Sequence, residues 1–138
     1  MTPWRILIVD DDRLTVALLS HAIADLGTIE TASNGQDALT RIGESPPSLI
    51  LLDALMPGLS GFEVCALIKA DPELSSIPII FVTGQRDQQT ETAALDAGAA
   101  DFISKPISIP VVKARVRTQL ALLNQKRALE DRIATQSS

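Results

Sequence analysis

Five short apolar segments alternate with five helix-like segments along the chain, and this alternation constrains the fold more than any other feature. The apolar segments span 4–9, 28–32, 48–53, 77–82 and 101–104. The third of them, SLILLD, has no polar alternation, which is typical of a strand covered on both faces. Strands that alternate with helices predict an α/β fold with one five-stranded parallel sheet. Right-handed crossovers then place helices on both faces, which makes the sheet doubly wound.

The segments between these strands carry the spacing and end signals of helices. The expected helices span 13–26, 35–42, 61–70, 88–97 and 107–133. Asp12 is placed to cap the first helix and Gly27 to stop it, while Asn34 is placed to cap the second and Gly43 to end it. Pro110 fits the first turn of the last helix, since a proline there leaves no hydrogen bond unmade.

Polar side chains follow four of the five expected strands. In parallel sheets of this kind, ligands bind outside the carboxyl ends of the strands. The residues delivered there are Asp10, Asp11 and Asp12 after the first strand, Asp53 at the end of the third, Thr83 after the fourth, and Lys105-Pro106 after the fifth. We therefore expect the functional site at this edge of the sheet.

The chemistry of these groups points to metal and phosphate. If the first and third strands are neighbours, the carboxylates of Asp10, Asp11 and Asp53 converge and repel one another. A hard divalent cation such as Mg²⁺ (or Mn²⁺), which prefers oxygen ligands, relieves this repulsion. The Lys105 ammonium and the Thr83 hydroxyl would complete a phosphoryl-binding site. A carboxylate in such a site can itself be the nucleophile and form an aspartyl-phosphate.

Four segments together resemble the receiver domain of two-component response regulators. They are ILIVDDD (6–12), LILLDALMPGLSGFEVC (49–65), IPIIFVTG (77–84) and GAADFISKP (98–106). The resemblance covers residues 4–123 and implies a flavodoxin-like strand order, 2-1-3-4-5. It also implies that the chain relays a signal by accepting a phosphoryl group from a histidine kinase or phosphotransfer protein. On this basis it is no enzyme beyond catalysing its own phosphorylation and dephosphorylation.

The resemblance implies a role for each residue that matches the family's motifs. Asp53 resembles the phospho-accepting aspartate. Asp11 resembles the main metal ligand, Asp10 acts mostly through a bound water, and the backbone carbonyl of Leu55 completes the ligand set. Because the family's metal is Mg²⁺, the resemblance and the carboxylate repulsion lead to the same cofactor.

The remaining matches concern the conformational switch. Thr83 resembles the hydroxyl that moves toward the phosphoryl group, and Lys105 resembles the lysine that contacts it, with a cis bond to Pro106. Phe102 stands where the family often has a switch tyrosine, but the chain contains no tyrosine. Phe102 is therefore either a switch that acts by packing or simply a core residue.

The charge distribution bears on partners. The formal net charge is −5, yet residues 1–110 hold 6 basic and 15 acidic residues, whereas 111–138 hold 6 basic and 2 acidic. An acidic body argues against direct nucleic-acid binding, which needs clustered Lys and Arg. The basic charges of the last segment alternate with leucines at helical spacing, which favours a solvated helix face.

The length suggests a division into a receiver domain, 1–123, and an extension of the last helix, 124–138. In the extension, Leu122, Lys126, Leu129 and Ile133 follow 4-3-4 spacing, which is compatible with a short coiled coil. The extension could link to an output domain beyond this chain, support a homodimer through the last helix, or be a frayed helix end.

Several features favour a cytoplasmic protein with no membrane partner. Apolar runs such as Ile6–Val9 are far shorter than the roughly 20 residues that cross a membrane. Three aspartates stand where a signal peptide would need an apolar stretch. Cys65 is the single cysteine, so an internal disulfide is impossible, and a reducing compartment is the simple inference.

Two other functions remain as alternatives. The same fold could serve as an interaction module that is never phosphorylated, although such a module would be free to lose the acidic, Thr and Lys groups. A phosphohydrolase of the haloacid-dehalogenase type also uses an aspartyl nucleophile and Mg²⁺. Its motif would begin at Asp10-x-Asp12, but Leu14 stands where Thr or Val is expected. A nucleotide-binding fold is disfavoured, because no glycine-rich phosphate loop follows the first strand.

Overall fold

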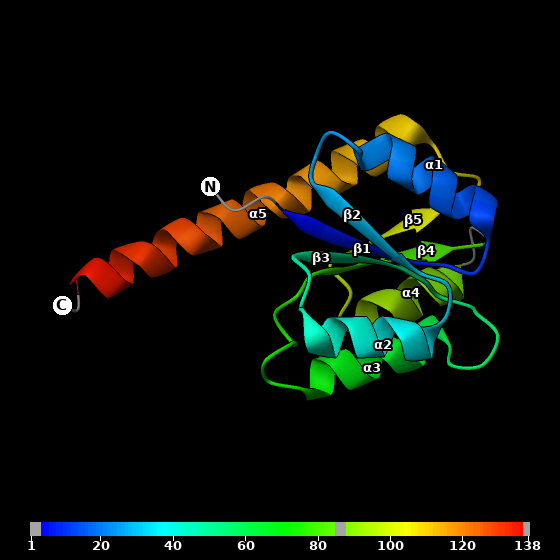
Figure 1. Ribbon diagram of the computed structural model, residues 1–138, viewed down its shortest axis with the longest axis horizontal. Helices are drawn as coiled ribbons and strands as arrows, with labels where there is room; N and C mark the ends of the chain where they lie inside the picture. The colour runs from blue at the N-terminus through cyan, green and yellow to red at the C-terminus, as the bar shows by residue number, and fades with distance from the viewer. Residues whose placement is uncertain (1–3, 85–87, 137–138) are drawn as a thin grey trace.

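The computed structural model describes residues 4–84 and 88–136. Its strands are β1 (Arg5–Val9), β2 (Thr28–Ala32), β3 (Leu49–Asp53), β4 (Ile79–Thr83) and β5 (Asp101–Ser104). Its helices are α1 (Arg13–Ile23), α2 (Gly35–Glu44), α3 (Gly61–Ala70), α4 (Gln88–Asp96) and α5 (Ile109–Gln136). The strands form one parallel sheet in the order β2-β1-β3-β4-β5 (Figure 1). Both the doubly wound fold and the strand order are confirmed.

Helices cover both faces of the sheet, with α1 and α5 on one side and α2, α3 and α4 on the other (Figure 1). Successive side chains of a strand point to opposite faces of the sheet. Each central strand therefore contributes side chains to two separate hydrophobic cores. In β3, Ile50 and Leu52 join the core under α2 and α3, while Leu49 and Leu51 join the core under α1 and α5. All four are fully buried. This two-sided burial explains why SLILLD shows no polar alternation.

Several element ends differ from the sequence expectations. α1 ends at Ile23, because the Leu26 amide turns back to the Ile23 carbonyl at 2.9 Å. β4 begins at Ile79, two residues late, since Pro78 has no amide to offer the ladder. Gly43 does not end α2, which runs on to Glu44. A glycine costs a helix only about 1 kcal/mol relative to alanine, so it does not stop one by itself.

α5 is 28 residues long and outruns the body of the protein. Val112, Val116 and Leu120 are buried against the sheet, and Leu123 packs at the edge of the same core. The helix continues past residue 123 without a break and projects from the body (Figure 1). Among the described residues, none of the helices combines the length and apolarity needed to cross a membrane.

Candidate functional site

Three carboxylates meet at the carboxyl edge of the sheet. Val9 of β1 is in register with Leu52 of β3, so the next residues, Asp10 and Asp53, lie side by side. One carboxylate oxygen from each of Asp10, Asp11 and Asp53 lies within 4.8 Å of the others. Asp10 and Asp53 are buried, whereas Asp11 is exposed. The structure therefore brings together the three predicted acidic residues.

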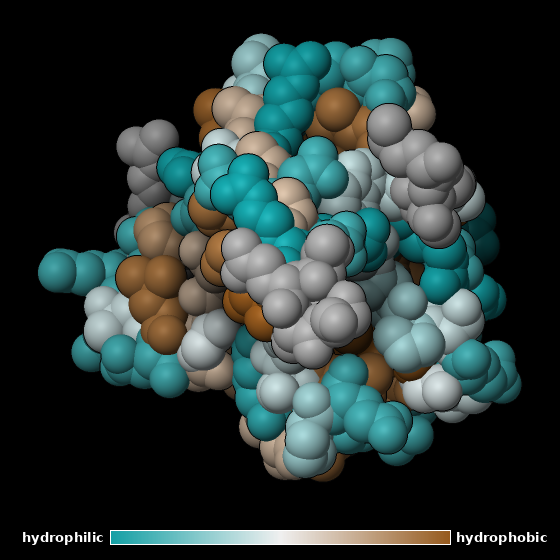
Figure 2. Space-filling model, turned by 90° about the vertical axis from the view of Figure 1, so that its left-hand side faces the viewer, coloured by the Kyte–Doolittle hydropathy of each residue, from teal (hydrophilic) through white to brown (hydrophobic). Residues whose placement is uncertain are grey.

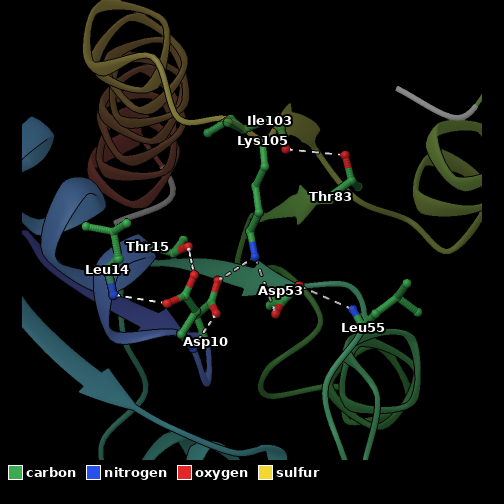
Figure 3. Close-up of polar contacts among 9 residues, drawn as sticks. Asp10, Leu14, Thr15, Asp53, Leu55, Thr83, Ile103 and Lys105 are labelled. Atoms are coloured by element: carbon green, nitrogen blue, oxygen red, sulfur yellow. Dashed lines mark hydrogen bonds and ion pairs between the residues drawn. The ribbon is translucent and has the colours of Figure 1, made fainter. Parts of the chain in front are cut away.

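Backbone amides two residues further along fix the orientation of the buried carboxylates. The Leu55 amide donates to Asp53 Oδ1 at 3.3 Å, and the Asp12 amide donates to Asp10 Oδ1 at 2.9 Å (Figure 3). Asp side chains commonly accept such bonds where a strand gives way to a turn. From the sequence, only the Leu55 carbonyl is expected at this position. Because Asp10 and Asp53 stand at strand ends, the contacts with backbone amides two residues further along could also have been predicted from the sequence.

Lys105 brings a positive charge to the same point from β5. Its Nζ lies 3.5 Å from Asp10 Oδ2 and 3.8 Å from Asp53 Oδ2 (Figure 3). The Lys105–Pro106 peptide bond is cis, as expected. The lysine thus joins the ends of β1, β3 and β5 into one cluster.

The environment of Asp53 disfavours its charged form. Burial raises the pKa of Asp53 to about 7, and the negative charge of Asp10 adds to this rise. Lys105 and the Leu55 amide act in the opposite direction without cancelling it. Without a further cation, this site therefore favours the protonated form of Asp53 more than water does.

The donor set fits a hard divalent cation. Asp10 Oδ2 is buried and accepts no hydrogen bond from any described residue, and its ion-pair partner Lys105 Nζ lies 3.5 Å away. A buried carboxylate oxygen normally accepts at least one hydrogen bond. It lies in a group of three carboxylates, the oxygen donors that Mg²⁺ takes. These residues could hold Mg²⁺ or Mn²⁺.

Asp12 stands apart from this cluster and caps α1, as expected from the sequence. Its Oδ1 accepts from the Leu14 amide at 3.1 Å and its Oδ2 from the Thr15 hydroxyl at 2.9 Å, which caps α1. The Thr15 hydroxyl, and to a lesser degree the Leu14 amide, lower the pKa of Asp12. Asp12, the third aspartate of the run, therefore stabilises the start of α1.

Thr83 lies beside the cluster rather than within it, and Phe102 lies on the neighbouring strand β5. The Thr83 side chain is buried, and its hydroxyl donates to the Ile103 carbonyl of β5 at 3.4 Å (Figure 3). Phe102 is half-buried and packs against the core that lies under α2, α3 and α4. The two residues occupy neighbouring strands, β4 and β5.

A comparison with protein families decides what kind of domain carries this site. The family model described as "Response regulator receiver domain" matches residues 6–117. This chain belongs to the response regulator receiver family. Receiver domains accept phosphoryl groups and act with histidine kinases in two-component signalling. Because the chain belongs to the receiver family, it is not assigned to the phosphohydrolase family. No observation on the described residues favours an interaction module that is never phosphorylated.

Individual relatives agree with this assignment. A probable cyclic di-GMP phosphodiesterase of Vibrio cholerae is 40% identical over an alignment of 144 positions, gaps included, which covers 99% of this chain and 33% of that protein. Response regulator PleD of Caulobacter vibrioides is 39% identical over 115 residues, which cover 83% of this chain and 25% of PleD. This receiver thus spans only a quarter to a third of these two relatives.

A solved structure shows the same fold. The signal receiver domain of a signal transduction histidine kinase from Syntrophus aciditrophicus superposes with a TM-score of 0.77 at 34% identity. The match covers 86% of this receiver and 90% of that chain. The receiver fold is therefore shown by sequence and by structure.

Proposed function

We propose that Asp53 accepts a phosphoryl group from a phosphohistidine on a histidine kinase or phosphotransfer protein, and that the chain thereby relays a signal. The observation that supports this is the convergence of Asp10, Asp11 and Asp53 with Lys105 at one edge of a receiver sheet. Beyond its own phosphorylation and dephosphorylation, we expect no catalytic turnover. A cytoplasmic location suits such a partner.

In the transfer, a carboxylate oxygen of Asp53 attacks phosphorus and forms a P–O bond. The P–N bond to the donor imidazole breaks, and its electron pair returns to the ring nitrogen. The product is an acyl phosphate on Asp53. Lys105 Nζ, 3.8 Å from Asp53 Oδ2, is placed to offset negative charge on the incoming phosphoryl oxygens.

Asp10, Asp11 and Asp53 would hold Mg²⁺, and the backbone carbonyl of Leu55 is the fourth predicted protein ligand. When bound, the ion supplies positive charge that offsets the repulsion among the carboxylates and between Asp53 and the phosphoryl oxygens. The raised pKa of Asp53 favours its protonated form, whereas only the ionised carboxylate is a nucleophile. The positive charge of the ion would therefore also favour the reactive form of Asp53.

Thr83 and Phe102 are the proposed switch. The Thr83 hydroxyl now donates to the Ile103 carbonyl at 3.4 Å, a long hydrogen bond. A phosphoryl oxygen on Asp53 would be a stronger, charged acceptor for the same hydroxyl. Movement of Thr83 would leave space that Phe102 can fill, reshaping the surface around α4, β5 and α5. An output domain beyond residue 138 is the proposed recipient of that change.

Intact-mass spectrometry after incubation with acetyl phosphate and Mg²⁺ tests the proposal. The full chain should gain the mass of one phosphoryl group, and Asp53→Asn should gain none. Asp12→Asn serves as the matched control, because Asp12 caps α1 and lies outside the cluster. A full mass gain in Asp53→Asn would overturn the assignment of the acceptor.

A further inference from the structure

A small cavity lies at the amino edge of the sheet, where α5 leaves the body of the protein. Residues 47–48 and 76–78, which precede β3 and β4, line one side of it, and α5 lines the other. Its volume is about 220 Å³. β3 runs from this edge to Asp53, so the cavity lies roughly 16 Å from the acidic cluster. We call it the amino-edge cavity.

One face of α5 forms the wall of the cavity. Four residues at i, i+3, i+4 and i+7 spacing share this face. They are Leu123, Lys126, Arg127 and Glu130. Figure 2 looks onto the end of the molecule from which α5 projects, and hydrophobic areas there are interrupted by hydrophilic ones. A ligand at this end would therefore meet both kinds of surface.

The more buried part of the lining is apolar. Pro47 and Ile77 are buried, and Pro78 and Leu123 are half-buried. Contact with these side chains favours a ligand that carries an apolar group of its own. Sites for drug-sized ligands usually have volumes of about 300–1,000 Å³, so the amino-edge cavity suits a smaller molecule.

The exposed part of the lining carries more positive than negative charge. Lys126 and Arg127 bring two positive charges, and Glu130 brings one negative charge. Lys126 takes part in none of the ion pairs formed among the described residues, so its ammonium group is available to a ligand. Residues 1–110 hold 15 acidic and 6 basic residues. A basic cavity beside such an acidic body favours an anion.

We propose that the amino-edge cavity binds a small carboxylate that carries an apolar group. The carboxylate would lie between Lys126 and Arg127, and the apolar group would lie against the prolines and Ile77. Ser48 and Ser76 also line the cavity, and their hydroxyls are hydrogen-bond donors for the same carboxylate. The bound acid would contact α5 and the loops before β3 and β4 at once. It would thus hold the extension to the body, independently of phosphorylation at the opposite edge.

Amide NMR spectra of the full unphosphorylated chain test the proposal, with benzoate as the probe. At constant ionic strength, benzoate should shift the amide signals of Ser48, Ser76 and the α5 wall, and the shifts should saturate. Saturation should need millimolar benzoate, because a ligand of so few atoms makes few contacts. Benzamide has the same shape without the charge and should bind about threefold more weakly. Shifts that never saturate, or equal binding of benzamide, would overturn the proposal.

Charge variants separate this cavity from a general attraction of anions to a basic helix. Lys126→Met should raise the dissociation constant of benzoate about threefold. Glu130→Gln should lower it by a similar factor, because it removes a charge that repels the carboxylate. Arg132→Met removes a positive charge from the same helix, but Arg132 does not line the cavity, so binding should be unchanged. Equal effects of Lys126→Met and Arg132→Met would contradict a defined site.

Two further variants test where the probe binds. Ser76 is exposed and lines the cavity, so Ser76→Leu should fold and abolish the saturable shifts by occupying the space. Thermal unfolding checks that this variant is folded. Asp53→Asn should bind benzoate like the native chain, because Asp53 lies at the opposite edge of the sheet. Native binding in Ser76→Leu, or lost binding in Asp53→Asn, would place the probe elsewhere and refute the proposal.

Discussion

Lys105 reaches across the end of β4 to lie 3.8 Å from the carboxylate of Asp53. The lysine follows β5 and the aspartate ends β3, and these two strands are not neighbours in the sheet. The same ammonium lies 3.5 Å from Asp10 Oδ2, so one flexible side chain balances part of the charge of two buried carboxylates. The acidic cluster and β5 are therefore electrostatically coupled before any phosphoryl group arrives.

Replacing Lys105 by methionine should weaken both stability and phosphorylation. Methionine keeps much of the stem but removes the charge that lowers the pKa of Asp53. We expect the metal-free protein at pH 8 to lose about 1 kcal/mol of unfolding free energy. Phosphorylation by acetyl phosphate should be at least about tenfold slower. Lys113→Met removes an ion pair far from the site and should phosphorylate at the native rate; equal slowing in both variants would contradict a specific role for Lys105.

Asp53→Asn should stabilise the metal-free protein at high pH. Burial and then the charge of Asp10 raise the pKa of Asp53 to about 7 from an ordinary value of 3.8, so the folded state binds the proton more tightly than the unfolded state. Stability from this group is fully present below the unfolded pKa and is lost as the pH rises toward 7. Urea unfolding at pH 8 should show Asp53→Asn more stable by about 1–3 kcal/mol. That gap should close as the pH falls toward 4, and a gap independent of pH would contradict the raised pKa.

Much of this site followed from sequence, for a physical reason. Parallel strands deliver their carboxyl ends to one edge, so Asp10, Asp53 and Lys105 could be placed together once the strands were recognised. The side-chain state of Thr83 could not be predicted in the same way. A hydroxyl rotates to suit its acceptor, and the acceptor here, the Ile103 carbonyl, belongs to the neighbouring strand β5.

Magnesium binding should separate the three consecutive aspartates. Asp10→Asn and Asp11→Asn should each weaken Mg²⁺ binding at least about tenfold, because each removes a charged oxygen ligand from the cluster. Asp12→Asn should bind like the native chain, since Asp12 caps α1 and asparagine also caps helices well. Isothermal titration of the unphosphorylated protein measures all three. Loss of binding in Asp12→Asn, with Asp10→Asn unaffected, would reverse the assignment.

Gly61→Ala should damage the site through the backbone. A Cβ on Gly61 would overlap the Asp53 carbonyl oxygen and approach the Ala54 Cα to 2.9 Å, both of them backbone atoms that cannot easily move. We expect a loss of at least about 2 kcal/mol in urea unfolding, from strain where α3 starts against β3. Gly43→Ala is the control: its Cβ would meet nothing within 4 Å, and alanine should stabilise α2 by about 0.5–1 kcal/mol. Similar results for both glycines would show that close packing at Gly61 is unimportant.

The contact between α5 and the start of β1 could not be found from sequence. Trp4 and Arg127 are separated by nearly the whole chain, and helical spacing alone does not say which face of an extension meets the body. The contact depends on α5 running past residue 123 in line with its packed part. The expected division at that residue therefore stays a prediction about domains, while the helix itself is continuous.

Arg127→Met should loosen the attachment of the extension and report it through the single tryptophan. The guanidinium carbon lies 4.3 Å from the Trp4 ring centre, a cation–π geometry that contributes about 0.5–1 kcal/mol at a partly exposed position. The variant should lose unfolding free energy of that size, and Trp4 emission should shift to longer wavelength as water reaches the ring. Arg132→Met removes an exposed charge from the same extension and should change neither measurement. A Trp4 spectrum that is unchanged in Arg127→Met would show that the ring does not hold the extension.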